Sequence, residues 1–211
     1  MTAPNINNVS GLSPISRVDG AKWGNSLRVY YVPASNTNAL YVGDPVVKVT
    51  GSANGTGING VDLATAGSNA VVTGVVCGFT GVAKAGSTNA PSFFGLSATP
   101  GSVYRPAATA QDYYVLVNDD PEALFTVQVT SNAVMSVGDV GKNFNLVAGT
   151  GSAYTGLSGF TISNTEVVGG ALGQVSVIGF DQTTRNDPTL PYANVLCRLN
   201  TSTETNRSTG I

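Results

Sequence analysis

The residues best suited by type to do chemistry lie in one short stretch, DYYVLVNDDPEALFTVQV, which spans residues 112–129. It contains four of the twelve acidic residues of the chain. One of them is Asp112, and the other three are Asp119, Asp120 and Glu122. Closely spaced carboxylates could bind a cation, or they could act as an acid and a base on a substrate.

The spacing of these acids favours a turn over either kind of site. A calcium loop places its oxygen ligands at alternate positions, whereas Asp119 and Asp120 are adjacent. A glycosidase needs two carboxylates on opposite sides of a cleft. Asn and Asp side chains bond to the backbone two residues ahead, and Pro121 fixes its own φ at a value that suits a turn. We therefore expect a connection between two strands with an acidic tip.

Two other routes to catalysis or cofactor binding are also disfavoured. The chain has no histidine, which excludes Ser-His-Asp and Cys-His catalysis and removes the commonest ligand of zinc, copper and iron. GTGING (55–60) has the glycines of a dinucleotide-binding turn, but the VDLATAG that follows is not a helix. We expect a hairpin tip there. The sequence predicts no enzyme, no cofactor and no metal site.

Charge is sparse, and the ten basic residues are scattered singly, which limits the partners of this protein. Charged residues make up 10% of the 211 residues, and the net charge is −2. Without a basic patch, nucleic acid is not an expected partner. No apolar run reaches the ~20 residues of a membrane span, so no membrane is expected. MTAPNINNVSGLSP has no signal-peptide pattern, so we expect synthesis in a cytosol without export.

Short β-like runs separated by Gly, Pro and Asn fill the chain from Leu27 onward. LFTVQV (124–129) and NVLCRLN (194–200) alternate apolar and polar residues, which is the period of a half-buried strand. The sequence predicts an all-β protein, namely an antiparallel β-sandwich that forms a single domain over residues 17–200. Cys77 and Cys197 lie in apolar runs, either as buried free thiols or as a pair across the sandwich.

Both ends of the chain and one long loop are candidates for contact with a partner. Residues 1–16 are polar and aperiodic, so we expect an extended N-terminal arm, and residues 201–211 read as a polar tail. The loop 81–100 is long for a connection inside a sandwich. The aromatic pair in that loop could instead cover the core. The candidate contact residues are Asn5 and Asn7 in the arm, Trp23 just after it, and Phe93 and Phe94 in the long loop.

Four segments of the chain carry a resemblance to a known family. They are YVGDPV (41–46), VVTGVVCGF (71–79), YRPA (104–107) and VNDDP (117–121). Their order over residues 1–200 resembles that of the small cement or decoration proteins that tailed bacteriophages encode beside their major capsid protein. The chain departs from this pattern in its final TSTETNRSTGI, where a last strand is expected.

The resemblance implies a structural virion protein with a jelly-roll-like sandwich and no enzymatic activity. Such a protein binds the outer surface of the capsid and stabilises the lattice against the pressure of packaged DNA. The implied partners are the major capsid protein and further copies of the chain itself. The alternative is a carbohydrate-binding or adhesin module on the virion surface, which would stack sugars on Trp23, Tyr30, Tyr31 or the Phe93–Phe94 pair.

Overall fold

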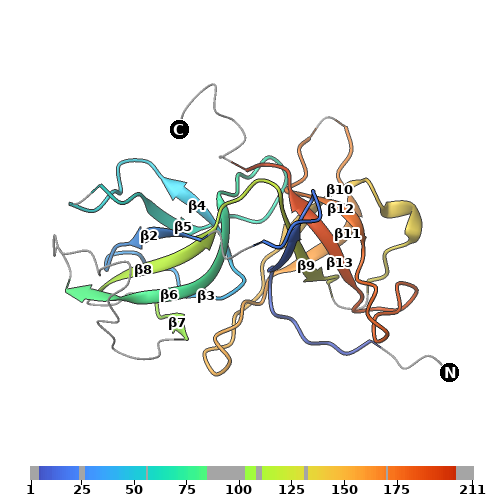
Figure 1. The fold of residues 1–211 in the computed structure, drawn as a ribbon, viewed down its shortest axis with the longest axis horizontal. Coiled ribbons are helices and arrows are strands. Elements are labelled where there is room, and N and C mark those ends of the chain that lie inside the picture. Colours follow the sequence, from blue (N-terminus) through green and yellow to red (C-terminus); the bar gives the residue numbers. More distant parts are fainter. Residues whose placement is uncertain are drawn as a thin grey trace.

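The computed structural model describes residues 5–23, 27–55, 57–84, 103–107, 111–130, 133–169 and 171–202. Strands and loops make up nearly all of these residues, and the described helical element is a single 3₁₀ turn, η1 (Val137–Asp139). Among the described residues, no helix is long and apolar enough to cross a membrane. Figure 1 shows two β units side by side.

The first unit is a closed barrel with the strand order β2-β5-β4-β6-β8. Its neighbouring strands are antiparallel except for β2 and β5, which are parallel where Tyr31 meets Gly60. Closure pairs the strand edges with one another, and this removes the open edges that a flat sheet would expose. The strands are β2 (Arg28–Val32), β4 (Pro45–Val49), β5 (Gly60–Leu63), β6 (Gly74–Lys84) and β8 (Gln111–Asn118).

The second unit is a six-stranded antiparallel sheet with the order β1-β9-β13-β12-β10-β11. A further bridge joins Val129, just after β9, to Ile162 in β11, so the sheet curls back on itself. The strands are β1 (Ser13–Arg17), β9 (Ala123–Gln128), β10 (Asn143–Val147), β11 (Thr161–Glu166), β12 (Val175–Phe180) and β13 (Asn194–Leu199). A two-stranded ribbon, β3 (Leu40–Tyr41) with β7 (Tyr104–Arg105), completes the described strands.

The described residues form two apolar cores, and the larger one extends from the sheet to Val75 of the barrel strand β6. The barrel core contains Val32, Val46 and Val115, and the sheet core contains Phe125 and Val177. Burial of such side chains stabilises the fold by about 1.5–3 kcal/mol each. Both cysteines are free thiols, so the alternative of a disulfide across the sandwich is wrong. Burial raises the pKa of the Cys197 thiol to about 12.

The all-β prediction is confirmed, and the antiparallel sheets are compatible with a β-sandwich. The jelly-roll connectivity is not confirmed, because the strands are distributed between a barrel and a curled sheet. The alternation in LFTVQV holds for Phe125 and Val127, which are buried, and for Thr126, which is not. The alternation fails at Gln128, which the pattern assigns to the solvent-facing side of the strand but which is only 4% exposed.

The extended N-terminal arm is not confirmed in its described part, residues 5–16. Leu12 is 1% exposed and belongs to the core of the sheet. Strand β1 pairs with β9, so the expected boundary at residue 17 falls inside a strand. In Figure 1, the blue strand β1 lies against the later strands of the sheet. The segment is polar because one side of it faces solvent, and its few apolar residues are enough to hold it on its own sheet.

Candidate functional site

The acidic stretch is a turn, as its spacing predicts, and it connects the two β units. Strand β8 belongs to the barrel and β9 to the sheet, so residues 119–122 span the junction. The Asn118 side-chain oxygen accepts from the Asp120 backbone N–H at 3.1 Å. The Asp120 side-chain oxygen accepts from the Glu122 N–H at 3.0 Å. These are the bonds to the backbone two residues ahead that Asn and Asp make in turns.

Each carboxylate of this turn faces an arginine from a different strand. Asp119 pairs with Arg28 of β2 at 2.8 Å, and Asp120 pairs with Arg17 of β1 at 3.4 Å. Arg198 of β13 lies 3.9 Å from Glu122.

These pairs link the barrel to the sheet, and they leave the acids committed to structure. Arg28 belongs to the barrel, whereas Arg17 and Arg198 belong to the sheet. Within the described residues, no group of three His, Cys, Asp or Glu side chains could hold a metal ion. Asp119 is the most buried of the three carboxylates, but its partner Arg28 is the most exposed of the three arginines. Ion pairs with an exposed partner stabilise a fold by about 0–1 kcal/mol.

Of the contact residues predicted from the sequence, Asn5, Asn7 and Trp23 lie in the described part of the chain. The Asn5 amide nitrogen donates to the carbonyl oxygens of Asp187 (2.8 Å) and Pro191 (3.0 Å), so this side chain is an internal anchor. Asn7 is exposed and Trp23 is half-buried. Phe93 and Phe94, together with most of the loop 81–100, lie outside the described residues.

The aromatic platforms of the alternative function find little support in the barrel. Tyr30 is 1% exposed, and its hydroxyl donates to Asp119 at 2.7 Å. Burial, followed by the nearby Asp119 carboxylate, raises the pKa of Tyr30. The ring of Tyr31 lies 5.7 Å from the ring of Tyr114. A sugar could not stack on Tyr30 without opening the barrel.

The most exposed large hydrophobic side chain of the described residues is Tyr154, at 96%. It lies in the loop between β10 and β11, the gold loop that projects from the body in Figure 1. The backbone of this loop is closed by a hydrogen bond from the Ser152 N–H to the Leu157 carbonyl oxygen (2.9 Å), and Gly156 N–H donates back to Ser152 (2.7 Å).

The base of the Tyr154 loop is fixed to the body. The Val42 N–H donates to the Gly156 carbonyl oxygen at 2.9 Å, and the Ser158 N–H donates to Val42 at 2.8 Å. A Cβ at Gly151 would lie 2.3 Å from the ring of Tyr41, so glycine is required for this close approach. The loop therefore presents Tyr154 to solvent from a defined backbone.

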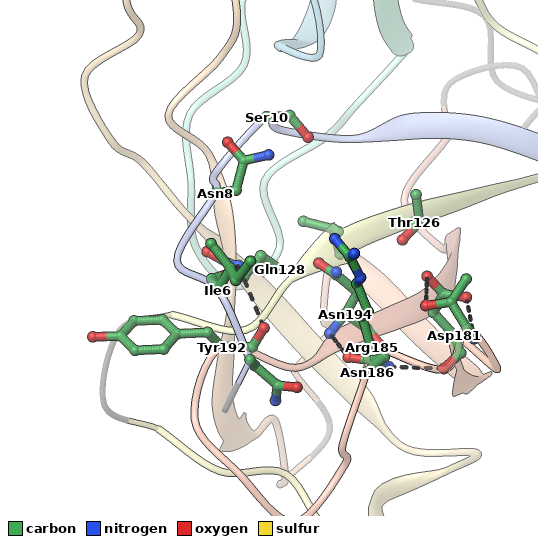
Figure 2. Close-up of a pocket in the computed structure, with 13 residues that line it drawn as sticks. Ile6, Asn8, Ser10, Thr126, Gln128, Asp181, Arg185, Asn186, Tyr192 and Asn194 are labelled. Atoms are coloured by element: carbon green, nitrogen blue, oxygen red, sulfur yellow. Dashed lines mark hydrogen bonds between the residues drawn. The ribbon is translucent and has the colours of Figure 1, made fainter. Parts of the chain in front are cut away.

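A polar pocket of about 280 Å³ lies between the N-terminal segment and the loop after β12. Its floor is the outer face of the sheet, where Thr126 and Gln128 of β9 lie beside Asn194 of β13. Figure 2 shows the lining side chains arranged around this space. The residues that line it are Asn5, Ile6, Asn8, Ser10, Thr126, Val127, Gln128, Asp181, Thr183, Arg185, Asn186, Tyr192 and Asn194.

Side-chain amides hold the walls of this pocket in place. The Gln128 amide nitrogen donates to the carbonyl oxygens of Ile6 (3.0 Å) and Tyr192 (3.3 Å), one from each wall. The Asn186 amide nitrogen donates to the carbonyl oxygens of Asp181 and Asn194, each at 2.8 Å. Gln128 is buried because these two walls cover it, which explains its departure from the alternating pattern.

Sequence reasoning missed this pocket because its residues come from three distant segments, 5–10, 126–128 and 181–194. The only available signal was Gln128, a polar residue at the end of a strand, and that signal is too common to be used. Comparison with protein-family models, with curated proteins and with solved structures finds no match for this chain.

Proposed function

We propose that this chain is a structural virion protein that binds the outer surface of a phage capsid and stabilises the lattice of the major capsid protein. The observation that carries the proposal is the Tyr154 loop, which exposes an aromatic side chain almost completely on a hydrogen-bonded backbone. Tyrosine is enriched among the residues that dominate binding energy at interfaces. A fixed loop loses little conformational entropy when it binds, so the affinity of a small contact is preserved.

The build of the body supports a mechanical role. The two β units are joined by a turn whose acids pair with arginines from both units, and the core of the sheet continues to Val75 of the barrel. Such a body transmits load between two attachment points better than two units on a flexible linker. A protein that binds only the assembled lattice stabilises it by mass action, and the effect adds up over every occupied position.

The contact surface that we propose differs from the one that the sequence suggested. Strand β1 is paired with its own sheet, and the side chain of Asn5 is hydrogen-bonded to the 187–191 loop. Tyr154 therefore takes the place of the arm as the proposed anchor on the capsid. The expected partners remain the major capsid protein and further copies of this chain.

The test is to titrate the purified protein onto expanded capsids that lack it. Bound copies per capsid protein and the temperature of shell rupture are the two readouts. We expect saturation at a fixed ratio and a higher rupture temperature. Tyr154→Ser should weaken binding by about tenfold or more, since such anchors are worth at least ~1.4 kcal/mol. The matched control is Leu172→Ser, which removes an exposed side chain from a different loop.

Two outcomes would reject parts of the proposal. If the wild-type protein does not bind expanded capsids, the capsid role is wrong. If it binds and Tyr154→Ser binds equally well, the capsid role stands but the anchor lies elsewhere. The number of copies per virion separates this role from an adhesin, because a lattice protein is present at high copy and an adhesin at low copy.

A further inference from the structure

The polar pocket has the features of a binding site for a small, neutral, polyhydroxylated molecule. Its lining combines donors and acceptors, with Asn8, Asn194 and Thr126 able to serve as either. One cation, Arg185, and one carboxylate, Asp181, are the charged side chains of the lining. The charges of the site therefore cancel, which disfavours phosphates and other strongly anionic ligands.

Arg185 is the lining residue with the clearest capacity to bind a ligand. It is exposed, and no ion pair or hydrogen bond ties its side chain to another of the described residues. In Figure 2, its side chain extends from the 181–192 loop toward the middle of the ring of lining residues. A guanidinium presents five N–H donors in a rigid fork, so it can bond two neighbouring hydroxyl oxygens at once.

Asp181 supplies the complementary acceptor. One carboxylate oxygen accepts from the Thr183 N–H at 3.1 Å and the other from the Thr183 hydroxyl at 3.4 Å. These two bonds orient the carboxylate and leave part of its acceptor capacity unused, because a carboxylate has about four lone-pair sites. One ligand hydroxyl can thus donate to Asp181, and another can accept from Arg185.

The floor of the pocket also contains an acceptor without a partner. The Oε1 atom of Gln128 is buried and has no hydrogen bond among the described residues, although the nitrogen of the same amide is bonded to both walls. Buried polar atoms in folded proteins are nearly always paired. This oxygen is closed off from the pocket space, so it marks a polar floor and is not itself an acceptor for a ligand.

We propose that this pocket binds a single sugar ring of a glycan. Adjacent hydroxyls of a sugar each donate and accept, which matches a lining of amides, hydroxyls and one Arg–Asp combination. The volume of about 280 Å³ lies at the small end of ligand pockets, and it suits one ring better than an extended chain. The hydrogen bonds from side-chain amides that hold the walls make the site preformed, which lowers the entropic cost of binding.

This inference does not rest on the proposed capsid role, and it uses residues other than the aromatic platforms considered from the sequence. A protein fixed to a capsid through the Tyr154 loop could still present the pocket if the two surfaces face different directions. The two activities are separable by mutation, because Tyr154 does not line the pocket.

The test is ligand-observed NMR on the full chain with a panel of methyl glycosides of glucose, galactose, mannose, rhamnose and N-acetylglucosamine, each at millimolar concentration. We expect saturation transfer to at least one glycoside. Arg185→Ala should weaken that binding by about tenfold or more, and Thr126→Val, which removes one hydroxyl from the floor at nearly constant volume, by about fivefold. Lys22→Ala is the charge-matched control outside the pocket.

Each other outcome contradicts the proposal. Absence of transfer to every glycoside of the panel would overturn it. Binding that is equal in the wild type, Arg185→Ala and Thr126→Val would place the sugar elsewhere. Acetate that binds as tightly as the best glycoside would show simple carboxylate capture by Arg185. A thermal melt of each variant checks folding, and no change is expected for Arg185→Ala because its side chain is exposed.

Discussion

Arg105 offers the sharpest test of how this fold is held together. It lies in β7, its side chain is 0% exposed, and it points into the loop that follows β2. One terminal nitrogen donates to the Asn38 carbonyl oxygen, and the other donates to those of Pro33 (3.0 Å) and Asn36 (2.8 Å). Its guanidinium carbon lies 5.8 Å from the centre of the Tyr113 ring. Burial lowers the pKa of Arg105.

The cost of Arg105→Ala follows from what the side chain leaves behind. The Pro33 oxygen keeps a bond from the Asn36 N–H at 3.0 Å. The oxygens of Asn36 and Asn38 lose the donor that Arg105 gives them, and each unsatisfied group costs about 1–3 kcal/mol. The vacated volume adds about 1–2 kcal/mol. The guanidinium is itself expensive to bury, which offsets part of the loss. We expect the free energy of unfolding to fall by about 4 kcal/mol.

Urea unfolding followed by circular dichroism measures this loss. Arg105→Met keeps most of the apolar volume, so it should lose ~1 kcal/mol less than Arg105→Ala. Arg105→Lys should also destabilise, because one ammonium cannot reproduce a planar fork that reaches three carbonyls. Arg185→Ala is the matched exposed control, with an expected change within about 0.5 kcal/mol. A loss below about 1.5 kcal/mol for Arg105→Ala would refute the reasoning.

Three more predictions concern the stability of the fold at Asp44, in residues 1–16 and at Gly11. Burial raises the pKa of Asp44 from 3.8 to about 6, so its contribution to stability is full below pH 4 and is lost as the pH rises to about 6. The free energy of unfolding of Asp44→Asn, relative to that of the wild type, should therefore be up to ~3 kcal/mol higher at pH 8 than at pH 4. If the variant and the wild type differ by the same amount at both pH values, the prediction is contradicted. Deletion of residues 1–16 should destabilise the protein by ~3 kcal/mol or more in a urea titration, since it removes Leu12 and most of β1, whereas a dispensable arm would leave the midpoint unchanged. Gly11→Ala should cost ~2 kcal/mol or more in thermal melts because its φ is +70° and the new Cβ would lie 2.5 Å from the Gly43 oxygen, while Gly20→Ala, with a φ of +81° and open space, should cost about 1 kcal/mol.

Features of the fold that depend only on neighbouring residues could be predicted from the sequence. Alternation in LFTVQV puts Phe125 and Val127 inside because successive side chains of a strand point to opposite faces. The NDDP turn could be predicted because Asn118 and Asp120 bond to the backbone only two residues ahead. The absence of histidine is a property of the composition and needs no structure.

Burial by a distant segment could not be predicted in this way. Gln128 reads as a solvent-facing residue, but Ile6 and Tyr192 come from the two ends of the chain to cover it. Residues 5–16 read as an arm because their polar composition hides both the buried Leu12 and the pairing of β1 with β9 that fix them to the sheet.

The sequence by itself determined that this protein is made mostly of short antiparallel strands, that its acidic stretch forms a turn, and that histidine chemistry is excluded. Only the tertiary structure decided that the strands close into a barrel and a curled sheet, which arginine meets each acid, and where a polar pocket opens. The physical reason is one of range. Strand period and turn chemistry are set within a few residues. Closure, ion pairing and pockets depend on segments that are far apart in the chain, such as the 122 positions that separate Gln128 from Ile6.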